Sequence, residues 1–81
     1  MNLVKLFLNH NTLSDIKNIA DVSSLVELRL EFNELNDSAL VTIEQLPNLK
    51  FVTLAGNGIT QGVVNSYNEQ SLEYQNNLQK Q

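Results

Sequence analysis

Three glycines follow an apolar run in the second half of the chain, and this pattern could bind phosphate. The segment FVTLAGNGITQG, residues 51–62, places Gly56, Gly58 and Gly62 between a β-rich run and a region with helical spacing. In dinucleotide-binding folds, such glycines let a pyrophosphate approach backbone N–H groups at a helix N-terminus. The complete site also needs a second strand and an acidic residue about 20 positions further on. The residues after Gly62 leave little room for that strand, so we expect no cofactor here.

Other residue types that could do chemistry are isolated in the sequence. His10 is the single histidine, and a metal site needs several convergent ligands. Glu31 and Glu34 are two carboxylates, but no nucleophile or second base accompanies them in a recognisable constellation. We therefore predict no metal site and no catalysis, with His10 at a rim and the glutamates solvated.

Composition narrows the class of protein. The chain has 81 residues, enough for one small domain, with nine acidic and five basic residues and a net charge of −4. The absence of a basic run argues against nucleic acid as a partner. No apolar stretch approaches the roughly 20 residues of a membrane-spanning helix, and there is no signal-peptide core and no cysteine. We expect an intracellular protein, cytoplasmic or nuclear, that does not bind a membrane.

Three segments of the chain share one pattern of residues. LVKLFLNHNTL, LVELRLEFNEL and LKFVTLAGNGI start at Leu3, Leu25 and Leu49, so successive starts are 22 and then 24 residues apart. In each, an aliphatic residue occupies the first, fourth, sixth and eleventh places, and an asparagine occupies the ninth. Such a repeat is typical of stacked architectures, in which each copy buries its apolar row against its neighbour. The first two copies carry the asparagine without any glycine nearby, so the glycines belong to the repeat rather than to a phosphate loop.

These segments resemble the leucine-rich repeat consensus L-x-x-L-x-L-x-x-N-x-L, and the resemblance covers residues 3–59. The spacing is similar to that of short intracellular members of the family. The resemblance implies an α/β solenoid, an arc with a short parallel β-sheet on its concave face and 3-10 or helical turns on its convex face. It says little about function beyond the family's habit of using the concave face for binding.

The repeated asparagines, Asn11, Asn33 and Asn57, follow the three predicted strands. The resemblance implies that they form a ladder, in which each amide bonds backbone groups of its own turn and of the neighbouring turn. A buried amide without partners costs about 1–3 kcal/mol. We therefore expect Asn33, the internal member, to be the polar residue least tolerant of substitution.

The chain divides into three repeats over residues 1–60 and a C-terminal helical cap with a polar tail over residues 61–81. After the first strand, apolar residues in the range 16–22 come at a spacing of three, which suits 3-10 turns. Residues 36–47 predict a short helix. In the last part the apolar residues follow helical spacing to about Tyr74, and we expect this helix to cover the open end of the solenoid.

The first strand has no predicted cap, because the repeat pattern starts at Leu3. Its aliphatic residues would be uncovered on one side, and its main chain would form an unpaired sheet edge. Two interpretations stay open. The chain is a fragment or subunit of a larger repeat protein, or the exposed strand is itself an interface that mediates assembly, for instance as a homodimer.

The third, fifth and seventh places of each segment point away from the core, because side chains alternate along a strand. Strands in register would align them in rows, with Phe7 and Phe51 exposed on either side of Arg29. Aromatic residues and arginine are enriched at binding hot spots. The alternative is that Arg29 only stacks on Phe7 and pairs with neighbouring glutamates. The predicted protein-binding residues of the concave face are Lys5, Phe7, Asn9, Glu27, Arg29, Glu31, Phe51 and Thr53.

The sequence thus predicts a protein–protein interaction module that binds an unidentified partner on this face, without catalysis, cofactor or metal. The alternative function is assembly through the uncapped first strand.

Overall fold

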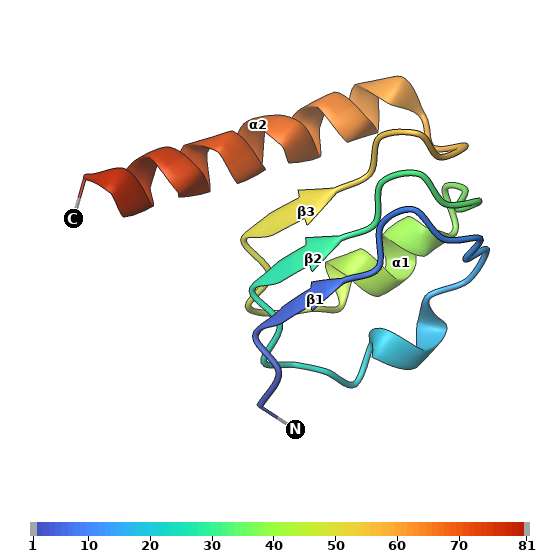
Figure 1. Ribbon diagram of the computed structural model, residues 1–81, viewed down its shortest axis with the longest axis horizontal. Helices are drawn as coiled ribbons and strands as arrows, with labels where there is room; N and C mark the ends of the chain where they lie inside the picture. Colours follow the sequence, from blue (N-terminus) through green and yellow to red (C-terminus); the bar gives the residue numbers. More distant parts are fainter. Residues whose placement is uncertain (1, 81) are drawn as a thin grey trace.

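A parallel sheet of three short strands organises the structure. The computed structural model describes residues 2–80, so residues 1 and 81, the outer limits of the two predicted parts, lie outside it. In chain order the elements are β1 Lys5–Phe7, the 3-10 helix η1 Lys17–Ile19, β2 Glu27–Arg29, α1 Ala39–Glu44, β3 Phe51–Thr53 and α2 Gln61–Gln79 (Figure 1).

The strands lie in the order β1-β2-β3 and pair without offset, so residues at the same place of each segment are neighbours. Leu6, Leu28 and Val52 form one such row. Leu28 is fully buried and Val52 nearly so, and both belong to the core beneath one face of the sheet. Burying a leucine side chain stabilises a fold by about 1.5–3 kcal/mol. The buried core contains Ile16, Leu25, Leu28, Leu30, Leu35, Ala39, Ile43, Leu46, Val52, Leu54, Ile59 and Val64.

The predicted solenoid arc is wrong. The described residues form a small domain of 36 × 30 × 20 Å, in which the parallel sheet is open and uncurled. Curvature in a solenoid accumulates from a small rotation at each repeat. Three strands of three residues accumulate too little rotation for an arc, and α2 packs along β3 instead of extending a stacked axis. The face that was predicted to be concave is therefore an open, uncurled face.

The segments between the strands have the local structures that their apolar spacing favours. The 3-10 helix η1 follows β1, and the α-helix α1 follows β2. The final helix is longer than predicted. It continues to Gln79 rather than giving way to a tail after about Tyr74, since residues 75–79 contain neither proline nor glycine.

The two edges of the sheet differ. At the β3 edge, the buried Ser71 of α2 donates its hydroxyl to the Val52 carbonyl and accepts from the Val52 N–H, at 3.1 and 3.0 Å. Figure 1 shows α2 alongside β3, with β1 at the opposite edge. The β3 edge is therefore covered and hydrogen-bonded, whereas no element of the described chain lies beyond β1.

Candidate functional site

The candidate site is the open face of the sheet, which is turned away from the core. We define the open face by the two rows of side chains that the strand register sets side by side. One row is Lys5, Glu27 and Phe51, and the other is Phe7, Arg29 and Thr53.

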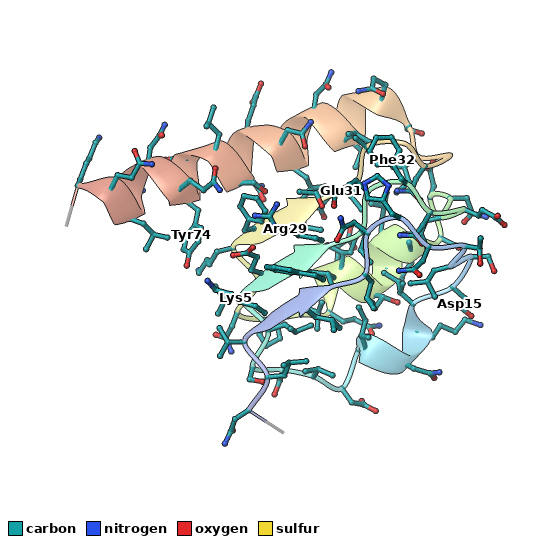
Figure 2. All side chains as sticks on the ribbon, in the orientation of Figure 1. Lys5, Asp15, Arg29, Glu31, Phe32 and Tyr74 are labelled. Carbon is teal, nitrogen blue, oxygen red and sulfur yellow. The ribbon has the colours of Figure 1, made fainter. Side chains whose placement is uncertain are left out.

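Arg29 lies at the centre of the open face, on the middle strand (Figure 2). Its guanidinium carbon is 5.1 Å from the ring centroid of Phe7 and 4.9 Å from that of Phe51, so it forms cation–π contacts with both rings. Its Nε donates to Glu27 Oε2 at 2.9 Å. Glu27 is 13% exposed at its side chain and also lies 3.9 Å from Lys5 Nζ. The arginine is thus held by one carboxylate and two aromatic rings.

The terminal nitrogens of Arg29 have no acceptor within residues 2–80. A guanidinium has five N–H donors, and Nε–H alone has a hydrogen bond in the described structure. The alternative interpretation paired Arg29 with neighbouring glutamates; in the structure Glu27 pairs with Arg29, whereas Glu31 accepts from Thr53 instead. Because the Arg29 side chain remains 33% exposed, its two NH₂ groups can reach a bound partner.

The two phenylalanines of the open face differ in exposure. Phe7 is 57% exposed, but Phe51 is only 7% exposed. The prediction that Phe51 is exposed is therefore wrong. Phe51 belongs to β3, against which α2 packs, so its ring forms a buried wall beside Arg29 rather than a binding surface.

Thr53 and Glu31 bind one another. The Thr53 hydroxyl donates to Glu31 Oε1 at 2.6 Å and accepts from the Leu30 N–H at 3.1 Å. Asn9 occupies the same place in the first segment as Glu31 in the second. It is half-buried, and its main-chain carbonyl accepts a hydrogen bond from the Asn11 side-chain amide at 3.3 Å. The Thr53 hydroxyl and Glu31 Oε1 are thus occupied by internal hydrogen bonds and are not free for a partner.

A row of left-handed residues borders the open face where the strands end. His10 and Phe32 both have φ of 60°, and Gly56 has φ of 73°. The rings of His10 and Phe32 stack with centroids 4.8 Å apart, and Phe32 is 53% exposed. A Cβ on Gly56 would collide with the Phe32 ring. Sequence reasoning missed this stack, although a glycine in the eighth place of the third segment is a signal for left-handed backbone.

The glycine segment that suggested a phosphate site is occupied by internal contacts. Gly56 lies under the Phe32 ring. The N–H of Gly58 donates to the Leu35 carbonyl at 2.7 Å, and Gly62 lies in the first turn of α2. The three glycines therefore belong to a turn, a bridge between segments and a helix, rather than to one cradle.

Two of the three ninth-place asparagines, Asn33 and Asn57, connect neighbouring segments, whereas the ladder implied by the resemblance does not extend to Asn11. Asn33 is buried; its amide donates to the carbonyls of Leu8 and Leu30 and accepts from the Leu13 N–H. Asn57 makes the corresponding bonds one segment later: its amide donates to the carbonyls of Leu30 and Leu54 and accepts from the Leu35 N–H. Asn11 is exposed and bonds the carbonyls of Leu8 and Asn9, both within its own turn.

Other site chemistry is sparse among residues 2–80. Those residues contain no group of three or more potential metal ligands and no helix that is both long and apolar enough to cross a membrane. A shallow hollow between α2 and the start of β3 is lined by Leu49, Lys50, Gln70, Glu73, Tyr74 and Asn77.

No protein-family model, curated protein or solved structure matches this chain with significant similarity. The resemblance to leucine-rich repeats thus depends on the repeated residues alone.

Proposed function

We propose that this protein is a leucine-rich-repeat-like binding module that holds another protein on the open face of its sheet and has no catalytic role. The observation that carries the proposal is Arg29, which is fixed by Glu27 and two aromatic rings while its terminal N–H groups lack acceptors in the described chain. An arginine held in this way loses little side-chain entropy when it binds. Phe7 next to it adds an exposed aromatic surface.

The chemistry of this pair indicates the class of partner. A guanidinium with two free NH₂ groups matches a carboxylate, which accepts two parallel hydrogen bonds. An apolar side chain next to that carboxylate would pack on Phe7. We therefore propose that the partner presents an Asp, a Glu or a C-terminal carboxylate flanked by an apolar residue. The net charge of −4 disfavours a strongly acidic partner at long range, so a single carboxylate is the better fit.

Selection of peptides from a random library against the 81-residue chain tests this proposal. Peptides with a carboxylate next to an apolar residue should be enriched. Arg29→Lys should weaken their binding about tenfold, because an ammonium group cannot make the paired hydrogen bonds. Lys17→Gln is the control, since it removes an exposed cation outside the open face.

Shifts in NMR signals on peptide addition should concentrate on β1 and β2. Enriched peptides that bind equally well to the Arg29→Lys variant, or whose signals map to α1, would contradict the proposal.

A further inference from the structure

The outer main-chain groups of β1 face away from the sheet. Val4 accepts hydrogen bonds from β2 through its carbonyl, and the Leu8 N–H donates to the Arg29 carbonyl at 2.9 Å. Main-chain groups alternate in direction along a strand, so those of Lys5 and Phe7 point the other way. No main-chain bond outside the β1–β2 pairing reaches either residue within residues 2–80.

The apolar core is also incompletely covered beside β1. Leu28 and Leu30 of the second segment are 0% exposed, whereas Leu6 and Leu8 in the first segment are only half-buried. Val4 is 46% exposed. The same edge therefore presents unpaired hydrogen-bonding groups and aliphatic surface, a combination that favours the addition of another strand.

We propose that β1 pairs with β1 of a second copy of this chain, in an antiparallel arrangement about a two-fold axis at Leu6. An axis perpendicular to the sheet reverses the strand direction and joins the two sheets into one of six strands. The N–H and carbonyl of Lys5 then bond the carbonyl and N–H of the partner's Phe7, and symmetry repeats both bonds.

Several positions of the two-fold axis would pair the outward-facing main-chain groups of the two β1 strands. The side chains favour the axis at Leu6. An axis at Lys5 would place the two Lys5 ammonium groups opposite one another, which is destabilising. An axis at Phe7 would leave Val4 without an aliphatic neighbour across the interface. The axis at Leu6 uses the whole strand, places Lys5 across from the partner's Phe7, and covers Leu6 and Leu8 with aliphatic side chains.

A second copy of the chain leaves no uncovered sheet edge, and this favours it over a single strand added from another protein. A foreign strand on β1 would itself present a new open edge. In the two-fold dimer, both β1 edges are used and the outer edges are the two β3 strands, which Ser71 and α2 already cover. Both open faces lie on the same side of the joined sheet, so the dimer presents the proposed binding surface twice.

A charge exchange across the axis tests the proposal. The mass of the 81-residue chain is measured by sedimentation from micromolar to millimolar concentration, and the mass should rise towards twice 9.1 kDa. Phe7→Lys places lysines across from one another and should weaken the dimer about tenfold or more. The double variant Lys5→Glu, Phe7→Lys should restore it, because each glutamate then faces a lysine.

Val41→Lys is the control, since it introduces the same charge at a side chain that is 60% exposed on α1. A monomer at every concentration would overturn the proposal, as would a dimer that Phe7→Lys leaves intact. Failure of the double variant to restore the dimer would overturn the register.

Amide exchange in the unmodified chain keeps the test valid if a variant fails to fold. Exchange at Lys5 and Phe7 should slow as the concentration rises, and exchange at Leu6, which faces β2, should not change. Rates at Lys5 and Phe7 that do not depend on concentration would also overturn the dimer.

Discussion

The hydroxyl of Ser71 bonds both main-chain groups of Val52, the N–H at 3.0 Å and the carbonyl at 3.1 Å. One side chain of α2 thereby takes the place of a further strand at the β3 edge. Ser71 is 5% exposed, so neither Val52 group has ready access to water as a substitute partner. The attachment of the helix to the sheet thus depends on a polar contact as well as on apolar packing.

Ser71→Ala should lower the free energy of unfolding by about 1–3 kcal/mol, because a buried donor and acceptor lose their partner. Urea denaturation measures the change. Ser66→Ala is the matched control on the same helix, since Ser66 is exposed and its hydroxyl bonds the Gly62 carbonyl one turn earlier. Equal effects of the two substitutions would show that the Val52 contact contributes nothing specific.

Asn33→Ala should be more damaging than Asn11→Ala. Asn33 is buried and bonds three main-chain groups, whereas Asn11 is exposed and bonds two carbonyls of its own turn. We expect a loss of about 2–3 kcal/mol for Asn33→Ala and less than about 1 kcal/mol for Asn11→Ala. Thermal and urea denaturation of both variants measure the difference, and a reversed order would contradict the role given to Asn33.

Gly56→Ala should destabilise the fold for two reasons. Its φ of 73° is unfavourable for alanine, and the new Cβ would meet the Phe32 ring. We expect a loss of about 1–2 kcal/mol. The Phe32→Ala background should relieve the steric part, so a double-mutant cycle should show coupling between the two positions.

Gly62→Ala is the control for glycine removal. Apart from its chain neighbours and the backbone of its own helix, no heavy atom of residues 2–80 lies within 4 Å of a Cβ at this position. We expect Gly62→Ala to be neutral or to stabilise the protein by up to about 1 kcal/mol. A loss at Gly62 as large as that at Gly56 would contradict the explanation for Gly56.

The sequence predicted the rows of the sheet better than it predicted what covers them. A constant place for each aliphatic residue is sufficient to align Lys5 with Glu27 and Phe7 with Arg29, because a one-residue slip would turn the apolar row out of the core. The burial of Phe51 could not be predicted in this way. It depends on where α2 packs, and no repeat pattern specifies that position.

The prediction of a solenoid arc was wrong for a related reason. The repeat describes how one segment stacks on the next, but overall shape depends on the number of segments and on the elements that flank them. The His10–Phe32 stack was missed because both residues occupy left-handed positions, where aromatic side chains are not expected from propensity. The sequence could not show that the terminal N–H groups of Arg29 are free, because this depends on Glu31 accepting a hydrogen bond from Thr53 rather than from Arg29.

Phe51→Ala and Phe7→Ala should separate stability from binding. Phe51 is 7% exposed, and its truncation should cost about 3–5 kcal/mol. Phe7 is 57% exposed, and its truncation should lower the free energy of unfolding by about 1 kcal/mol or less. The same truncation should weaken the binding of any ligand to the open face. Denaturation and binding of the selected peptides measure the two effects. Similar stability losses would mean that the helix does not cover Phe51 in solution.

Asp37 couples the start of α2 to the loop before α1, and this coupling should depend on pH. Its carboxylate accepts from the Thr60 N–H at 2.8 Å and from the Thr60 hydroxyl at 2.7 Å. These hydrogen bonds, the hydroxyl bond first, hold the pKa of Asp37 below its usual value of 3.8. A lowered pKa means that the stabilisation is fully present above the unfolded-state pKa and is lost as the pH falls through the folded-state value.

The free energy of unfolding should therefore decrease more steeply below about pH 4 in the unmodified chain than in Asp37→Asn, whose amide does not titrate. Urea denaturation between neutral and acidic pH measures both curves, and NMR titration of the Asp37 carboxyl carbon gives its pKa directly. Asp15→Asn is the matched control, because Asp15 accepts a comparable bond from the Lys17 N–H in an exposed turn but connects no distant segments. Parallel curves for the unmodified chain and Asp37→Asn through the acid range would show that the Thr60 bonds do not persist in solution.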